Sequence, residues 1–221
     1  MWWTLALRNL LRNRLRSVLS LAAIVVGVWA LIVGKGFIAG ITENFIRARI
    51  DAVSGHVVVT PADYPSEKMS HPVKDLIEVG PEAAAWLDAH TVAWTRRVIF
   101  SPTAISRGDS LRVRAIGFVP GRDEAVFPRE AFKVEGEIPT AEGVAVSVGV
   151  ARMLGVAVGD PLTLQVRTMD GAINAVIVPV RGVFSGNNGW LDRFGLFVPM
   201  PVAEDIVRSA GRASHVAARL T

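Results

Sequence analysis

Hydrophobic and polar positions follow two different periods along this chain, and the change falls about a quarter of the way along it. From Ser17 to Gly34 no side chain is charged, and the apolar stretch continues past Lys35 to about Ile41. A helix of 18 residues spans roughly 27 Å, close to the hydrocarbon thickness of about 30 Å. Because the extension beyond Gly34 supplies the missing length, the pattern predicts a transmembrane helix over residues 17–42.

The segment before this helix, residues 1–16, is predicted to form an amphipathic helix in the membrane interface. Its apolar side chains recur at helical spacing, and arginines follow another face in steps of four. The segment contains Arg8, Arg12, Arg14 and Arg16 and no acidic residue. Because positively charged flanks stay on the cytoplasmic side, we expect a cytoplasmic N-terminus and an external location for everything after residue 42.

The helical period continues beyond the predicted membrane segment, and this predicts a helical stalk over residues 43–53. Within the membrane segment, Gly36 and Gly40 are four residues apart and are expected to form a close-packing face for another transmembrane helix. The alternative is that these two glycines occur in the membrane helix without a packing role. A cleaved signal peptide is the alternative for the whole segment, but its apolar part is usually about 7–15 residues and no A-x-A-like site follows here.

Beyond residue 54 the pattern changes to short apolar runs and alternations, which are typical of β-strands. Strands are predicted at 56–60, 92–105, 111–119, 144–148, 162–166, 173–184, 194–198 and 216–220. Helices are predicted to begin at Pro81, at Ser147 or Gly149, and at Pro201, with glycines ending the last two at Gly155 and Gly211. This order predicts a mixed α+β domain with two lobes. One lobe comprises 54–105 and 185–221, and the β-rich other lobe comprises 106–184.

Composition narrows the possible partners. The chain has 221 residues, a mean hydropathy of +0.38 and a net charge of +4. The four N-terminal arginines account for that charge, because the other 20 Lys and Arg balance the 20 Asp and Glu. We therefore expect no nucleic-acid partner, since that would require a basic face on the folded domain. The absence of cysteine excludes disulfides, thiol catalysis and Cys-ligated metals, and is compatible with either side of the membrane.

No catalytic pattern stands out in the sequence. The four histidines are far apart and match no metal-ligand spacing. Most aspartates lie beside glycine or in turns, where turn chemistry explains them, and neither a Walker A sequence nor a G-x-S-x-G motif occurs. Arg96 and Arg97 are expected on a solvated strand face. We therefore expect no catalytic residue, no metal, no cofactor and no enzymatic activity.

Six recognisable stretches of sequence follow one another along nearly the whole chain. They are ALRNLLRNRLRSVLSLAAIVVGVWALI, DAVSGHVVVT, RRVIFSPTAIS, AIGFVPGRDEAVF, GVAVSVGVARMLGVAVGDPLTLQVRTMDGAINAVIVPVRGVF and LDRFGLFVPMPVAEDIV. In this order they resemble the N-terminal part of ABC transporter permeases of the MacB/LolC–LolE/FtsX family. Residues 151–160 carry the strongest single resemblance. The Gly-His-Val pattern after the helix is most similar to the lipoprotein-releasing LolC/LolE branch.

The resemblance implies a location in the bacterial inner membrane and a periplasmic domain whose lobes are called Porter and Sabre. It implies a dimer with a second permease copy or a paralogue, driven by a separate cytoplasmic ATPase, in contact with the lipid bilayer. Movement would pass through the membrane helices to the lobes, which push or release a substrate without threading it through a pore. Family permeases carry three more transmembrane helices and an ATPase-coupling segment. We therefore expect this chain to be a fragment or a split gene product.

Three segments are candidate contacts with a partner or substrate, with a purely connecting role as the alternative for each. They are the loop 62–72, which contains Tyr64, the segment 186–190 and the helix extension 43–50. The second segment contains Asn187, Asn188 and Trp190. A lipoprotein or another periplasmic protein is the partner that we expect there, and drug or peptide export and a cell-division role are the alternatives. A single-pass anchored binding or assembly domain, or an anchored hydrolase, are the alternative functions.

Overall fold

The computed structural model describes residues 14–49, 55–62, 73, 76–130, 132–186 and 189–220. Side chains of the first helix are described as far as residue 40. The chain forms two compact units, Met1–Arg47 and Ala48–Thr221.

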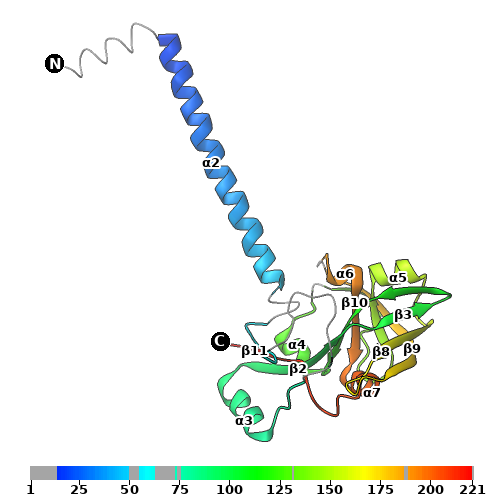
Figure 1. The fold of residues 1–221 in the computed structure, drawn as a ribbon. Coiled ribbons are helices and arrows are strands. Elements are labelled where there is room, and N and C mark those ends of the chain that lie inside the picture. Colours follow the sequence, from blue (N-terminus) through cyan, green and yellow to red (C-terminus); the bar gives the residue numbers. More distant parts are fainter. Residues whose placement is uncertain are drawn as a thin grey trace. The chain divides into compact units, whose positions relative to one another are not determined.

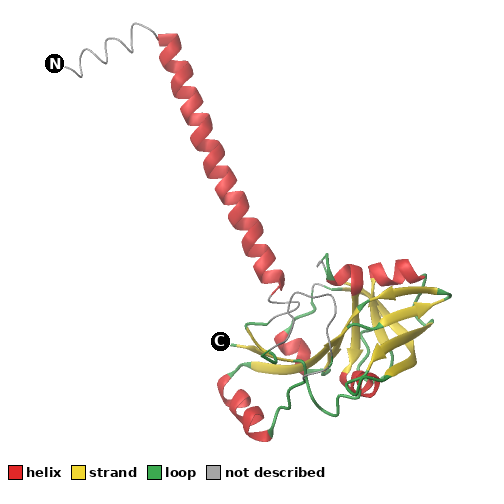
Figure 2. Cartoon of the chain, in the orientation of Figure 1, coloured by secondary structure: helices red, strands yellow, loops and turns green. Residues whose placement is uncertain are grey.

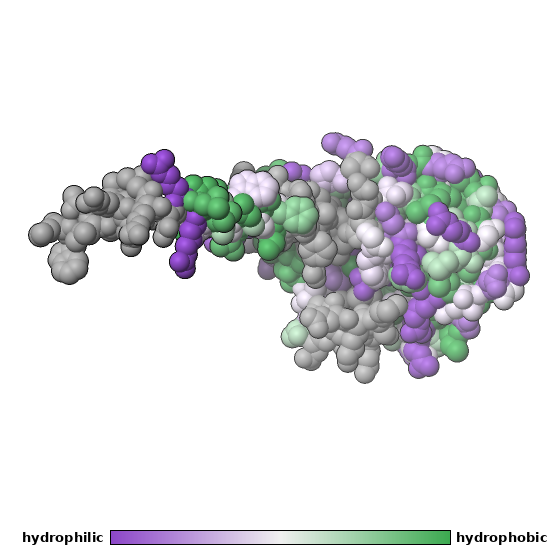
Figure 3. Space-filling model, turned by 90° about the horizontal axis from the view of Figure 1, so that it is seen from above, coloured by the Kyte–Doolittle hydropathy of each residue, from purple (hydrophilic) through white to green (hydrophobic). Residues whose placement is uncertain are grey.

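The described part of the first unit is one long helix, α2 (Arg14–Arg49), of 36 residues, whose last turn continues past Arg47 (Figure 1). No proline interrupts it, so each backbone N–H can reach the carbonyl four residues earlier. The part Arg14–Gly40 has a mean hydropathy of 2.4 in its most apolar window, none of which is buried, and is long and apolar enough to cross a membrane. Hydrophobic side chains gather along this helix (Figure 3). The helix runs through the predicted membrane segment and into the range predicted as a stalk.

The second unit is a mixed α+β domain, which confirms the predicted fold class. Its strands are β1 (Val57–Val59), β2 (Ala93–Phe100), β3 (Thr103–Ser106), β4 (Asp109–Arg112), β5 (Arg114–Phe118), β6 (Lys133–Gly136), β7 (Val144–Ser147), β8 (Pro161–Arg167), β9 (Ile173–Ser185), β10 (Gly195–Pro199) and β11 (His215–Arg219). Its helices are α3 (Pro81–His90), α4 (Arg122–Val126), α5 (Val148–Leu154), α6 (Leu191–Phe194) and α7 (Met200–Val207). Figure 2 shows these helices around the strands, and α4 packs against β2 and α7 against β5.

The strands form one sheet in the order β1-β11-β2-β5-β10-β7-β9-β8-β3-β4, and β6 pairs with β9. The pairs β5–β10 and β7–β9 are parallel, and the other pairs are antiparallel. The long strand β9 joins the two parts of the sheet, because residues 173–179 pair with β8 and the rest with β7 and β6. The predicted lobe boundaries remain a prediction. The sheet itself crosses them, since β5 and β7 both pair with β10.

Two strands predicted as continuous, 92–105 and 111–119, are each broken in the structure, so these two predictions are corrected. The first breaks at Ser101–Pro102 and the second at Val113. The breaks face each other, because the N–H of Val113 donates to the carbonyl of Pro102 at 3.0 Å. Proline has no N–H for a sheet ladder, and at this point the hairpin bends from pairing β2 with β5 to pairing β3 with β4.

Local signals account for most helix ends. The hydroxyl of Ser147 accepts a hydrogen bond from the N–H of Val150 at 3.4 Å, and Gly155 ends α5 in the left-handed conformation, as predicted. Helix α7 ends earlier than predicted, at Arg208 with φ 56°, instead of at Gly211. The short elements α4, α6 and β6 were not predicted, because four or five residues carry too little periodicity.

The contact of α7 with the sheet depends on one glycine. A Cβ placed on Gly117 in β5 would lie 2.6 Å from the Cβ of Ala203 in α7 and 3.1 Å from the carbonyl of Val98. The absence of a side chain therefore sets how closely α7 can approach β5. Ala203 and Ile206 of α7 are fully buried in the main core, which extends across both parts of the sheet.

Candidate functional site

The described residues contain no group of three or more His, Cys, Asp or Glu side chains that could hold a metal ion. Surface hollows and a group of buried ion pairs occur among the described residues.

Trp190, a predicted contact residue, lies immediately before α6 and is only partly exposed. The guanidinium of Arg114 lies 3.7 Å from the centre of its ring, within the range of a cation–π contact. The ring also packs against an aromatic cluster that includes Phe184 and Phe197. Much of Trp190 is thus committed to the domain itself, and contact with a partner stays a prediction for its exposed part.

Asp192, which follows Trp190 closely in the sequence, forms hydrogen bonds with residues at and just before the start of the segment 186–190. Its carboxylate accepts hydrogen bonds from the N–H of Gly186 at 2.6 Å and from the hydroxyl of Ser185 at 3.2 Å. These bonds tie the end of β9 to α6, so the segment has fixed ends. Asn187 and Asn188 lie between them, outside the described residues, as does Tyr64. Their predicted contact role stays a prediction.

A buried group of charges lies between β2 and α4, and it corrects the expectation for Arg97. This side chain is 1% exposed and its partner Asp123 is 0% exposed. Arg97 donates two hydrogen bonds of 2.7 Å to the Asp123 carboxylate, and its guanidinium lies 3.3 Å from the centre of the Phe127 ring. Arg97 is therefore buried because α4 and the residues after it cover this face of β2, and Asp123 serves as its partner.

Arg129 completes the buried charged group. It donates to Asp123 and, at 2.9 Å, to Glu124, and its guanidinium lies 4.4 Å from the Phe197 ring centre. Burial lowers the pKa of the Arg129 guanidinium below its ordinary value, and the nearby Asp123 carboxylate acts in the opposite direction. The group has an internal partner for each charge, which is the arrangement of a structural ion network.

A hollow of about 280 Å³ opens on the outer surface of β3, β8 and β9. It is lined by Ile105, Ser106, Arg107, Asp160, Pro161, Thr163 and Ile177. Arg107 and Asp160 form an ion pair of 3.1 Å at its rim. No pattern in the sequence predicted this surface. Its lining residues come from three separate stretches of the chain, and only strand pairing brings them together.

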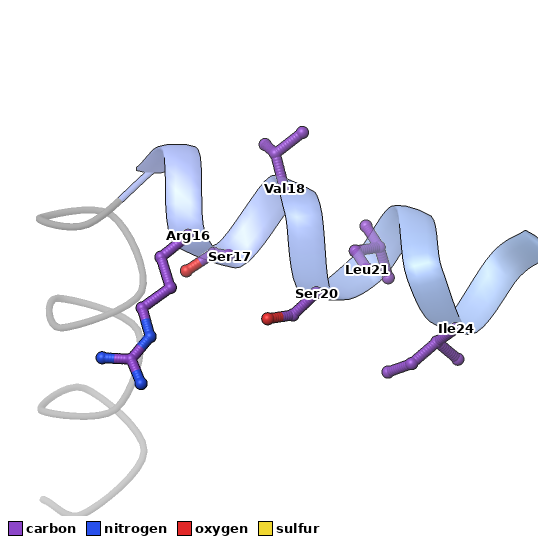
Figure 4. A pocket seen from close by; sticks show the side chains of 6 residues that line it. All are labelled: Arg16, Ser17, Val18, Ser20, Leu21 and Ile24. Carbon is purple, nitrogen blue, oxygen red and sulfur yellow. The ribbon is translucent and has the colours of Figure 1, made fainter.

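A second hollow, of about 500 Å³, lies along the first turns of α2 (Figure 4). It is lined by Arg16, Ser17, Val18, Ser20, Leu21 and Ile24. Arg16 and Ser20 extend to the same side of the helix in this view. A cationic side chain beside an apolar helix surface is the arrangement expected where a helix enters a membrane.

The other predicted residues of the first unit lie on the same helix. Arg14 and Arg16 are exposed at its start, whereas Arg8 and Arg12 lie outside the described residues. A Cβ placed on Gly36 or Gly40 would meet no atom within 4 Å, so both glycines leave open space at the helix surface. Their predicted roles, in orientation and in helix packing, stay predictions.

Comparison with known proteins gives a family match and a fold. Residues 17–221 match the family model described as the MacB-like periplasmic core domain. The periplasmic region of MacB from Actinobacillus actinomycetemcomitans is similar with a TM-score of 0.50 at 11% identity, over 74% of this chain and 73% of that one. This similarity supports the fold. No curated protein matches the chain.

Two further solved structures are similar at lower scores. The extracellular domain of the ABC-type transporter YknZ from Gram-positive bacteria has a TM-score of 0.49 at 15% identity, over 74% of this chain and 81% of that one. A domain of a permease protein from Porphyromonas gingivalis has a TM-score of 0.42 at 16% identity, over 66% and 63%.

Proposed function

The chain belongs to the family of MacB-like periplasmic core domains, and we propose that it supplies the first membrane helix and the outer domain of an ABC transporter permease. The observation that carries this proposal is the extent of the family match. It begins at residue 17, within the apolar helix, and continues through the whole folded domain to residue 221. Helix and domain therefore match the family as one unit.

In this role the chain couples ATP hydrolysis by a separate cytoplasmic subunit to movement of the outer domain. The continuity of α2 supports the proposal. Its 36 residues correspond to roughly 54 Å, well beyond the hydrocarbon thickness of about 30 Å. A helix without a proline break transmits a displacement along its length, because bending it would disrupt backbone hydrogen bonds. The membrane end of α2 and the segment 43–49 would then move together.

We place the chain in the inner membrane with its N-terminus in the cytoplasm. The arginines at 8, 12, 14 and 16 support this orientation, because no acidic residue accompanies them. A second permease copy or a paralogue is the proposed partner within the membrane. The chain itself would perform no catalysis, and the ATPase would supply the chemical step.

Within the family, we propose that this chain belongs to the lipoprotein-releasing branch. This proposal rests on the Gly55-His56-Val57 pattern, which the structure places at the start of β1. Gly55 has φ 62°, and the Nδ1 of His56 accepts a hydrogen bond from the N–H of Leu220 at 3.3 Å. Both residues thus have a structural use at the sheet edge, and the assignment to this branch is drawn from the pattern alone.

Co-purification tests the proposed function. The natural gene product is purified in detergent from its own host, and an ATP-binding subunit is expected to accompany it in a fixed ratio. A variant with Arg152→Glu, an exposed change on the domain, is the matched control and should retain the subunit. If the natural product purifies without any ATP-binding subunit, the coupling proposal is wrong. The chain then functions as a membrane-anchored binding or assembly domain.

A further inference from the structure

The outward face of strands β3, β8 and β9 can be derived from the strand register. Directly paired residues in antiparallel strands lie on the same face of a sheet, and alternate residues along a strand share that face. Ile105 pairs with Thr163, which pairs with Ile177. The neighbouring rows are Arg112–Thr103–Gln165–Ala175 and Arg167–Ile173 on one side, and Pro161–Pro179 on the other. We call these four rows the outer β-face.

Two of the three isoleucines of the outer β-face are unusually exposed for their size. Ile177 is 70% exposed and Ile173 is 68% exposed, whereas the alternate residues Leu162, Leu164 and Val178 on the inner face are buried. A single exposed apolar residue needs no explanation, but a contiguous group beside a hollow marks a contact surface. Ile105, Pro161 and Ile177 line the hollow of about 280 Å³ described above.

The charges on this face have one sign. Its four rows contain Arg112 and Arg167, and no acidic residue. Arg181 continues β9 beyond Pro179 and is also exposed. Among the described residues, none forms an ion pair with these three arginines. The nearest acid at the hollow, Asp160, is already paired with Arg107 and accepts from the N–H of Ala157 at 3.0 Å.

We propose that the outer β-face docks an acidic segment of a partner protein, with an apolar side chain of that segment entering the hollow beside Ile177. Carboxylates on one side of this side chain would pair with Arg112 and Arg167, and a carboxylate on the other side would pair with Arg181. Electrostatic complementarity of this kind sets partner choice and association rate more than total affinity. The inference needs only the folded domain, so it stands independently of the coupling to an ATPase.

Two other occupants fit these observations less well. A second copy of the same face would bring arginines against arginines, since a two-fold contact pairs a surface with itself. An anionic membrane complements the charge, but apolar anchors must enter the interface by about 5–10 Å. Ile173 and Ile177 lie within a strand of a sheet face, not on a protruding loop. A protein segment can instead follow the rows of the sheet.

Site-specific photo-crosslinking tests this proposal. The full-length protein carries p-benzoylphenylalanine in place of Ile177 and is irradiated in its native membranes, and the crosslinked peptide is sequenced by mass spectrometry. The same replacement at Val92, which is 62% exposed and outside the hollow, is the positional control. The charge variant Arg112→Glu with Arg167→Glu is compared with Arg152→Glu, an exposed arginine on α5.

We expect a crosslink from position 177 to one segment of another polypeptide that contains an apolar residue between aspartates or glutamates. Its yield should fall at least fivefold in the double variant and stay unchanged in Arg152→Glu, with the co-purifying ATPase unaffected. Adducts with phospholipid, with a second copy of this chain or with a neutral or basic segment would overturn the proposal. So would a yield at 177 no higher than at 92, provided that the thermal unfolding midpoint is unchanged.

Discussion

At the scale of single residues, Asp123 on α4 is the central hydrogen-bond acceptor of the buried charged group that lies against β2. Its carboxylate accepts three hydrogen bonds, two from Arg97 and one from Arg129, in a site with no exposure to solvent. Removing this buried carboxylate charge takes away the acidic partner that Arg97 and Arg129 share, although Arg129 keeps its ion pair with Glu124. The cost of one uncompensated buried charge is typically about 3–5 kcal/mol, whereas an exposed pair contributes about 0–1 kcal/mol.

We therefore expect Asp123→Asn to lower the free energy of unfolding by about 3–5 kcal/mol. Arg107→Ala, which breaks the pair with Asp160 at a side chain that is 67% exposed, should cost less than about 1 kcal/mol. Urea unfolding of the two variants and the wild-type chain measures both values. Equal losses in the two variants would contradict a structural role for the buried group.

Gly117 gives a second prediction at this scale. We expect Gly117→Ala to destabilise the domain by about 1–3 kcal/mol, because the new Cβ would lie 2.6 Å from that of Ala203. Adding Ala203→Gly should recover part of this loss, since it removes the clashing methyl group. Thermal unfolding of the single and double variants provides the measurement. Gly189→Ala, where a Cβ meets nothing within 4 Å, is the control and should change little.

At the scale of elements, α2 has glycines on two different faces. Gly36 and Gly40 are four residues apart and lie on one face, whereas Gly27 lies nine residues before Gly36, which is about two and a half turns. Gly27 therefore faces the opposite side of the helix. Gly34 lies seven residues after Gly27, about two turns, and shares its face. Since all four glycines leave open space at the helix surface, packing specificity must come from the face that meets a partner helix.

If the packing face is the one predicted, Gly36→Leu and Gly40→Leu should each reduce association between copies severalfold, because the added side chain separates the helices. Gly27→Leu should have little effect. Resonance energy transfer between copies in lipid vesicles measures this, with dyes at a cysteine introduced into a chain that has none. The predicted packing face would be wrong if the unsubstituted chain showed no energy transfer between copies. It would also be wrong if Gly27→Leu lost as much energy transfer as the other two variants.

At the scale of the whole outer domain, β9 makes the two parts of the sheet mechanically dependent on each other. It pairs with β8 at one end and with β7 and β6 at the other. The main core is likewise continuous, with Phe100 of β2, Leu164 of β8 and Ile206 of α7 in one cluster. A core shared in this way favours cooperative unfolding.

Native-state hydrogen exchange on the full chain in detergent tests this dependence. The amide protons of β2 and β8 are expected to exchange with the same free energy of opening, because neither part of the sheet can open while β9 stays paired. Residues near the free edge at β1 should exchange faster. A lower opening free energy for β8 than for β2 would show that the β3–β4–β8 part unfolds on its own.

The sequence alone sufficed for features that depend on neighbours along the chain. The uncharged run of α2 and the hydroxyl cap at Ser147 are local, so periodicity and capping residues predict them directly. The mixed α+β class and the family resemblance follow from the order of such elements. Of the candidate contacts, Trp190 was identified as a loop aromatic, but its packing against Arg114 depends on a strand far away in the sequence.

Tertiary structure alone decided which faces became buried and which residues met. Alternation along β2 does not show that Arg97 is covered, because its partner Asp123 lies 26 residues later on a helix too short to predict. The breaks at Pro102 and Val113 arise where one hairpin passes between two parts of the sheet. The outer β-face combines Ile105, Thr163 and Ile177 only through strand register, and register depends on pairing between distant segments.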